Sequence, residues 1–368
     1  MSARRSFSGI ASPAARLWAV GAGMRVRLYE RGWLRQQHLR AKVISIGNIA
    51  WGGTGKTPFT IWLAGRLQNA GLKVSILTRG YQRTSPERVK ALAPGTDADL
   101  ARTDGDEVQL YLRHLSGVAV GIGASRYDAG HLVEARFPVD VHLLDDGFQH
   151  LALARDLDLV LLDASDPWSI QHRGGLLRES PRALRRARAI VLNEREAGPG
   201  SDAVEMLAEI HKLSPGAPAF RFRTALRNFE AQGGSSCSVA EMRTRRPVAF
   251  CALGNPASFF STLTSAGIHP LACKTYHDHH RYSADDLARI ERLARQSGAD
   301  CLITTEKDLV NLPAGTVLSM PLYWAAVEAI VEQEAALVRW ITQSVGIVAK
   351  SLSADGGVVP RQEVSASR

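Results

Sequence analysis

The sequence predicts an α/β protein with two domains, each built around parallel strands, and a basic amphipathic helix at its N-terminus. Short β-rich runs alternate with helical stretches through most of the 368 residues. A polar, glycine-rich patch at 232–236 separates this series from a second, shorter one. Because strands that are joined through helices usually align in parallel, each series indicates a sheet covered by helices. We expect the boundary between the domains within 225–245.

The individual elements follow from local patterns of apolar residues. Helices are expected at 58–70 in the first series and at 257–266 and 284–297 in the second. The strands are expected at 42–46, 73–77, 118–122, 139–144, 157–162 and 189–192, and then at 247–252, 301–304 and 322–326.

The two ends of the chain differ in composition from the rest. The tail is rich in Ser, Ala, Gly and Val, and such segments bury too little apolar surface to fold. We therefore expect it to be disordered. The predicted organisation is an N-terminal segment 1–40, a domain 41–235, a smaller domain 236–345 that closes over the active site, and a tail 346–368.

The N-terminal segment is strongly basic. Residues 1–42 contain eight arginines and Lys42 against one acid, Glu30, within a chain of net charge +9. Apolar residues recur there at helical spacing beside Trp18, which is typical of a helix that lies in a membrane interface. A helix packed on the protein's own core fits these residues equally well, and three interspersed glycines weaken the helix prediction. The apolar stripe consists of Leu17, Val20, Met24 and Leu28.

Composition argues against several classes of protein. No run of 18 apolar residues occurs, so a membrane-spanning helix is not expected, and the N-terminus lacks the features of a signal peptide. The four cysteines lie far apart without a C-x-x-C pair, which favours reduced thiols over disulfides or a zinc site. A basic chain can bind nucleic acid, but no nucleic-acid-binding module is recognisable.

The strongest local signal is the glycine-rich loop GNIAWGGTGKT at 47–57, between a β-rich run and a helix. This is the context of a P-loop, whose backbone N–H groups surround phosphate oxygens at a helix N-terminus. Ala50 replaces the first glycine of the usual motif, although three glycines remain. The first domain is therefore predicted to be P-loop NTPase-like and to bind ATP and Mg²⁺. The loop residues concerned are Ala50, Trp51, Gly52, Gly53, Thr54, Gly55, Lys56 and Thr57, with Lys56 reaching the β and γ phosphates.

Two adjacent acids, Asp145 and Asp146, follow the buried run at 139–144. In a P-loop protein, a carboxylate at the end of a neighbouring strand lies beside the magnesium ion. We expect at least one of the two to bind the metal directly or through water. The residues do not decide which one.

Two further clusters are candidates for proton transfer. The acidic turn at 103–107 contains Asp106, although such a turn is often only a helix N-cap. The segment 276–280 contains three histidines, which also fit a polar surface loop or a metal site. If the two clusters met across the domains, Asp106 and His279 would form a carboxylate–imidazole base able to accept a hydroxyl proton.

Together, these motifs resemble the lipid A disaccharide 4′-kinase (tetraacyldisaccharide 4′-kinase) family from about residue 13 to residue 343. Eight segments carry the resemblance, and in combination they are specific. They are GNIAWGGTGKTP at 47–58, LTRGY at 77–81, GDE at 105–107, LDDGFQH at 144–150, LLRE at 176–179, LGNP at 253–256, DHH at 278–280 and TTEKD at 304–308.

The resemblance implies transfer of the ATP γ-phosphate to the 4′-hydroxyl of a tetraacylated glucosamine disaccharide 1-phosphate, a step of lipid A biosynthesis. It makes Asp106 the base and His279 its partner, with Lys56 on the phosphates. Magnesium would be held by Thr57, Asp145 or Asp146, and Glu107. Implied substrate or phosphate contacts are Arg79, Tyr81, Arg126, Gln149, Arg178, Glu179 and Asp278.

The sequence departs from the family pattern at two positions outside the P-loop. Val108 stands where the family usually has proline, and Gln82 stands where a glycine is expected. Neither change removes a functional group.

The resemblance also favours the membrane interpretation of the N-terminal segment, because each CH₂ of an acyl chain costs about 0.8 kcal/mol to expose to water. It implies a peripheral protein on the cytoplasmic face of the bacterial inner membrane. The expected partners are the acylated disaccharide phospholipid and an anionic membrane surface, with no nucleic acid and no obligate protein partner.

The main alternative is a P-loop ATPase or GTPase that acts as a switch or metal chaperone. A guanine-binding protein needs an N-K-x-D segment after a late strand. At that place the chain has Asn193 followed by Glu194, without the lysine or the aspartate. The sequence therefore argues against GTP.

Overall fold

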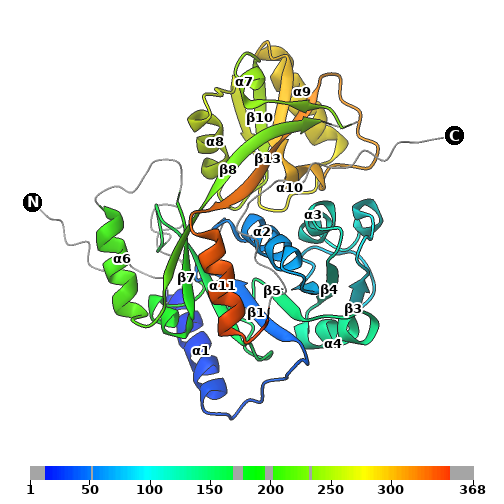
Figure 1. Cartoon of the computed structure of the whole chain (residues 1–368). Coiled ribbons are helices and arrows are strands. Elements are labelled where there is room, and N and C mark those ends of the chain that lie inside the picture. The colour runs from blue at the N-terminus through cyan, green and yellow to red at the C-terminus, as the bar shows by residue number, and fades with distance from the viewer. Residues whose placement is uncertain (1–12, 51–52, 169–176, 195–201, 232–233, 349–368) are drawn as a thin grey trace, which may run out of the picture.

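The structure is a computed structural model that describes residues 13–50, 53–168, 177–194, 202–231 and 234–348. The predictions for Trp51, for Gly52 and for the tail from 349 onward lie outside the described residues. In Figure 1 the chain forms a larger lower half that contains both ends of the described chain and a smaller upper half.

The described strands form one continuous 13-stranded sheet that runs through both halves, and the α/β fold class is confirmed. The strand order is β11-β10-β12-β13-β8-β7-β6-β1-β5-β2-β4-β3, with β9 beside β8. In chain order, the strands are β1 (Lys42–Gly47), β2 (Val74–Thr78), β3 (Val89–Leu92), β4 (Ala119–Gly123), β5 (Val141–Asp145), β6 (Leu157–Asp163), β7 (Ala189–Asn193), β8 (Ala219–Ala231), β9 (Ser236–Cys237), β10 (Pro247–Cys251), β11 (Ala272–Thr275), β12 (Cys301–Thr305) and β13 (Leu322–Val331).

Most strand pairs are parallel, so their carboxyl ends lie on a common edge. Strand β1 pairs with β5 on one side and β6 on the other, and β5 pairs with β2. This edge therefore carries the loops after β1, β2 and β5, where the P-loop, Arg79 and Asp146 lie. Ligands of open parallel sheets bind at this edge.

Helices cover both faces of the lower half, as Figure 1 shows. Helices α2 (Lys56–Asn69), α3 (Asp106–His114) and α11 (Glu334–Ser344) contribute to one apolar cluster with strands β1, β5 and β6. On the opposite face, α4 (Arg126–Arg136) packs on β2 and β4, and α6 (Asp202–Leu213) lies over β6 and β7 with the 3₁₀ helix η2 (Pro181–Arg186). A second 3₁₀ helix, η1 (Ala98–Ala101), precedes α3.

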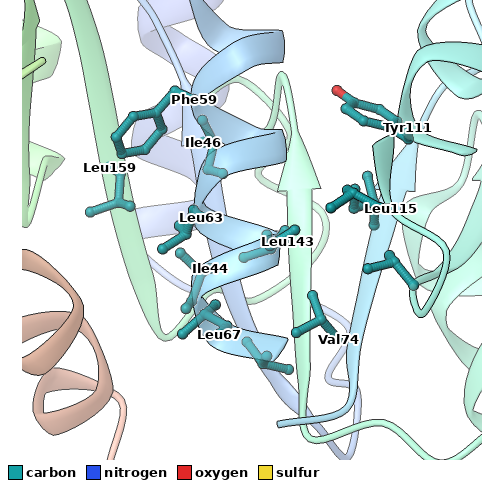
Figure 2. Close-up of a cluster of buried hydrophobic side chains, with 14 of the residues drawn as sticks. Ile44, Ile46, Phe59, Leu63, Leu67, Val74, Tyr111, Leu115, Leu143 and Leu159 are labelled. Atoms are coloured by element: carbon teal, nitrogen blue, oxygen red, sulfur yellow. The ribbon is translucent and has the colours of Figure 1, made fainter. Parts of the chain in front are cut away.

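The core positions α2 relative to the first strand, as Figure 2 shows. Phe59 and Leu63 of α2 are fully buried against Ile44 and Ile46 of β1. Each such side chain contributes about 1.5–3 kcal/mol on burial. The packing fixes the start of α2 at Lys56, directly beyond the carboxyl end of β1.

The upper half is a second layered unit. Helices α9 (Ala284–Gln296) and α10 (Glu306–Leu309) cover one face of β10 and β12, while α7 (Val239–Met242) and α8 (Pro256–Ser265) cover the other. The two halves are joined through the long antiparallel pair of β8 and β13, which has a bulge at Ala326 and Val327. The chain enters the upper half along β8 and returns along β13 to α11. The predicted domain limits at 235 and 345 remain predictions.

All nine expected strands are present, with shifts of one to five residues at some ends, and the helix expected at 58–70 begins two residues earlier. Four strands were not predicted. Strand β8 alternates polar and apolar residues and is only partly buried, so it lacks the continuous apolar run of its neighbours. Strands β3, β9 and β11 are short, and β11 is largely exposed.

At the N-terminus, the predicted basic helix is present as α1 (Pro13–Glu30). Its Met24 is 58% exposed, whereas Val26 is buried, and Trp33 just beyond it is 73% exposed. Glu30 pairs with Arg185 of η2, at 3.0 Å between Arg185 Nη2 and Glu30 Oε1, which ties the end of α1 to the lower half. No helix in the described part of the chain combines the length and apolar character needed to cross a bilayer.

Candidate active site

The P-loop turns through Gly55, which has φ +81° and is the N-cap of α2. A Cβ at Gly55 would lie 2.6 Å from Asn193 Nδ2, so only glycine fits this turn. Two side-chain amides, the buried Asn48 and the half-buried Asn193, contact the loop: Asn48 Nδ2 donates to Thr54 Oγ1 at 3.1 Å, and Asn193 Nδ2 donates to the Thr54 carbonyl at 3.3 Å. The backbone is thus shaped before any phosphate arrives.

Ala50, which replaces the first glycine of the usual motif, lies in extended backbone. It forms an antiparallel bridge with Leu177 and is 3% exposed. The neighbouring Arg178 N–H donates to the Ile49 carbonyl at 2.7 Å. Because the residue does not adopt a positive φ, alanine is accommodated here without strain.

Asp146 lies between two cations at the carboxyl end of β5. Its Oδ1 is 3.2 Å from Lys56 Nζ, and its Oδ2 is 2.5 Å from Arg178 Nη1. Burial alone would raise the pKa of Asp146, but the charges of Lys56 and Arg178 hold it well below its usual range. The residue has φ +51°, an uncommon conformation that turns its carboxylate toward the P-loop lysine.

Asp145 and Glu107 form an acidic pair behind this contact. Burial and then the charge of Asp146 raise the pKa of Asp145, and burial with the charges of Asp145 and Asp106 raises the pKa of Glu107 far above its usual value. A divalent cation bound between these carboxylates would offset the repulsion between their negative charges. The oxygen donors and their charge therefore fit Mg²⁺.

Asp106 and His279 meet across the two halves, 173 positions apart in the sequence. The distance between Asp106 Oδ2 and His279 Nδ1 is 2.7 Å. Asp106 is the first residue of α3, where Gly105 has φ +113° and no room for a Cβ beneath the Tyr81 carbonyl at 2.8 Å. Burial raises the pKa of Asp106, but the His279 hydrogen bond and the charge of Lys307 outweigh it, so the pKa lies below its usual value.

The remaining predicted contacts are arranged around these groups. Gln149 Nε2 donates to the Asn48 carbonyl at 2.8 Å and to Glu179 Oε1 at 3.0 Å, and Glu179 also pairs with Arg186 at 2.7 Å. These two residues therefore brace the loop that carries Arg178. The Tyr81 ring lies 4.6 Å from the His279 ring.

Positive charge gathers around His150 near the same edge. Burial and then four arginines lower the pKa of His150 to about 4. Two of the four, Arg79 and Arg126, were predicted as substrate contacts, and Arg126 is 7% exposed. The same positive charge that disfavours protonation of His150 would attract an anion to this region. The four arginines are Arg126, Arg155, Arg25 and Arg79.

The chain is similar to known proteins over most of its length. The model of one protein family, described as tetraacyldisaccharide-1-P 4′-kinase, matches residues 8–346. The chain belongs to this family. A tetraacyldisaccharide 4′-kinase of Syntrophobacter fumaroxidans is 42% identical over 286 residues, 77% of this chain and 74% of the relative. A second such kinase, from Koribacter versatilis, is 37% identical over 318 residues, 85% of this chain and 91% of the relative.

A solved structure supports the 4′-kinase family fold. The crystal structure of LpxK from Aquifex aeolicus in complex with ATP has a TM-score of 0.68 and 29% sequence identity to this chain. The similarity covers 90% of this chain and 98% of the other. The chain therefore has the fold of a 4′-kinase over nearly its whole length.

Sequence reasoning missed three residues at this site of the 4′-kinase fold. Asn48 and Asn193 hold the P-loop, and Lys307 lies 3.2 Å from His279 Nε2. Lys307 is part of the TTEKD segment at 304–308, which was noted as a family motif without a role. That motif was the signal from which Lys307 could have been found.

Proposed function

We propose that this chain transfers the γ-phosphate of ATP to the 4′-hydroxyl of a tetraacylated glucosamine disaccharide 1-phosphate. The observation that carries the proposal is the Asp106–His279 contact between the two halves, in a member of the 4′-kinase family whose P-loop lysine contacts Asp146. A nucleotide switch needs the P-loop but has no use for a carboxylate–imidazole base that is completed by a residue of the other half.

In this proposal, the residues divide the reaction between them. The P-loop amides and Lys56 hold the β and γ phosphates and stabilise the charge that develops on them. Asp106 accepts the proton of the attacking hydroxyl, and His279 orients the Asp106 carboxylate through the 2.7 Å contact. Arg178, already paired with Asp146, lies where it can neutralise the transferring phosphoryl group.

We further propose that Thr57, Glu107 and Asp145 or Asp146 hold the magnesium ion. In the described residues no preformed cluster of three His, Cys, Asp or Glu ligands is present, so phosphate oxygens would complete the coordination. Held by these residues, Mg²⁺ would neutralise part of the negative charge of the nucleotide phosphates.

The arginines near His150 suit the anionic 1-phosphate of the acceptor. Arg25 belongs to α1, so this basic group joins the N-terminal helix to the active-site edge. We propose that α1 and the exposed Met24 and Trp33 dock on the anionic membrane surface at the cytoplasmic face of the inner membrane. An acylated acceptor could then present its headgroup to the site without leaving the bilayer.

The direct test of function is to incubate the purified chain with ATP labelled at the γ position and a panel of acylated disaccharide 1-phosphates. We expect label on the 4′ position of the non-reducing sugar. Label found only as inorganic phosphate, with every acceptor unchanged, would contradict the proposal and favour the ATPase alternative. Omitting Mg²⁺ should abolish transfer.

The membrane proposal makes its own prediction. Replacing Met24 and Trp33 with serine should weaken binding to anionic vesicles, because both side chains are exposed and would bury apolar surface in the interface. Co-sedimentation with vesicles of anionic and neutral lipid measures this. Replacing Val317 of the upper half, which is 91% exposed, with serine serves as the control. Equal sedimentation of all three proteins would count against docking through α1.

A further inference from the structure

The lysine of the TTEKD segment contacts the imidazole of the proposed base pair. Lys307 Nζ lies 3.2 Å from His279 Nε2 and 3.9 Å from Asp106 Oδ2. Lys307 comes from α10 in the upper half, whereas Asp106 begins α3 in the lower half. Figure 1 shows these two short helices facing each other between the halves.

The hydrogen-bonding capacity of lysine decides which ring nitrogen of His279 carries the proton. An ammonium group has three donors and no acceptor, so a contact with Nε2 requires that Nε2 be the unprotonated nitrogen. The proton of the neutral ring then lies on Nδ1, from which it is donated to Asp106 Oδ2 at 2.7 Å. Lys307, His279 and Asp106 thus form one directed chain of hydrogen bonds.

The charge of Lys307 acts in the same direction. A hydrogen on His279 Nε2 would point at the Lys307 ammonium, whose Nζ lies 3.2 Å away, so this position of the proton is disfavoured. Asp278 acts in the opposite direction, but it is nearer to Lys307 than to the ring, at 3.4 Å against 3.8 Å. The Tyr81 ring, 4.6 Å from the His279 ring, completes the surroundings.

Lys307 is held in this position by its own segment. Thr305 caps α10 by accepting from the Asp308 N–H, and Asp308 accepts from Tyr282 Oη and the Ala252 N–H at 2.8 Å each. Next to Lys307, Glu306 contacts His114 of α3 at 2.8 Å. The segment that carries Lys307 is therefore anchored to both halves. This distinguishes Lys307 from a lysine on a loose surface loop.

We propose that Lys307 is a positioning residue that fixes His279 in its Nδ1–H tautomer, from which Nδ1 donates to Asp106. This rests on the proposed function only in the role of Asp106 as the base. Lys307 touches neither the nucleotide nor the acceptor in this proposal. Its effect reaches the reaction through His279.

The tautomer is measured directly by ¹⁵N NMR of the full chain labelled at histidine, with His279 assigned from a His279→Gln variant. In the wild type, we expect a protonated Nδ1 and an unprotonated Nε2 at neutral pH. In Lys307→Met, we expect protonation of Nε2. In Lys307→Gln, whose amide can still donate, the wild-type tautomer should persist. An unchanged His279 spectrum in Lys307→Met would overturn the proposal.

Kinetics supply the second readout. Without the ammonium, nothing holds the proton of His279 on Nδ1 from the Nε2 side, so kcat should fall in Lys307→Met and return toward the wild-type value in Lys307→Gln, which keeps a donor. KM for ATP should stay close to that of the wild type, because Lys307 does not bind the nucleotide. Lys274→Met is the matched control, since Lys274 lies in neighbouring β11 against Tyr276, 5.6 Å from the ring centroid. An equal loss of kcat in Lys307→Met and Lys307→Gln would mean that Lys307 is only structural.

The two readouts separate this inference from the proposed function. The NMR experiment needs no substrate, so it tests the contact between Lys307 and His279 even if the chain phosphorylates no disaccharide. Conversely, an active wild-type kinase whose His279 spectrum is insensitive to Lys307 would leave the function intact and remove this inference. Thermal unfolding of each variant shows whether the fold persists, and Lys307→Gln, which keeps a donor at that position, serves as the second variant.

Discussion

Lys56→Ala is expected to lower kcat by about 10²–10³-fold while leaving the fold intact. The Lys56 ammonium would stabilise the negative charge that develops on the terminal phosphates during transfer. The fold should persist, because Asn48 and Asn193 hold the loop at Thr54 independently of Lys56. Asp146 keeps a partner after the change, because Arg178 remains 2.5 Å away. Single-turnover transfer from labelled ATP and thermal unfolding measure the two effects separately.

Lys42→Ala is the matched control for this change. Lys42 also pairs with an aspartate, Asp156 at 2.9 Å, but it lies at the amino end of β1, the opposite edge of the sheet from the P-loop. Its replacement should leave turnover unchanged. Turnover of Lys56→Ala equal to that of Lys42→Ala would end the interpretation of 47–57 as a phosphate-binding loop.

The second large effect is expected at the contact between the halves. Asp106→Asn should lower kcat by about 10²–10⁴-fold, because the amide keeps the shape of the side chain but cannot accept the proton. His279→Ala should also lower kcat, through Asp106. If the two act as one unit, the double variant should be little worse than Asp106→Asn alone. Rate constants for both single variants and the double variant complete the cycle.

The control for this cycle is another imidazole–carboxylate contact between the two halves. His114 of α3 lies 2.8 Å from Glu306 of α10, away from the P-loop. His114→Ala loses a contact between the halves but no proposed catalytic group, so kcat should change little. If the effects of Asp106→Asn and His279→Ala multiply, the two residues act independently and the base-pair proposal is wrong.

Much of the lower half could be predicted from the sequence because its information is local. Strand β1, the glycine turn and α2 follow one another within about thirty residues, and each has its own pattern of apolar residues. Strand β8 was missed because it alternates exposed and buried residues while it passes through the expected linker. The reason is physical: a strand that joins two layered units is covered unevenly along its length.

The arrangement of the active site could not be predicted from local sequence patterns alone. Nothing near Asp106 or His279 in the sequence requires their contact, which arises because β8 and β13 hold the two halves face to face. The resemblance to the family suggested the Asp106–His279 pair. The contact of Lys307 with His279 is visible only in the structure. The backbone strain at His279, with φ +58°, is likewise invisible in a pattern of residue types.

The paired strands β8 and β13 have one more consequence. Since the chain leaves and rejoins the lower half through adjacent antiparallel strands, everything from 232 to 321 is, topologically, the contents of one enlarged hairpin turn. The histidine and the lysine reside inside that turn, while the glycine loop and the aspartate reside outside it. The glycine loop and the proposed base thus belong to the outer stretch, and the histidine proposed to orient that base belongs to the inserted one. Their meeting depends on the geometry of a single two-stranded ribbon.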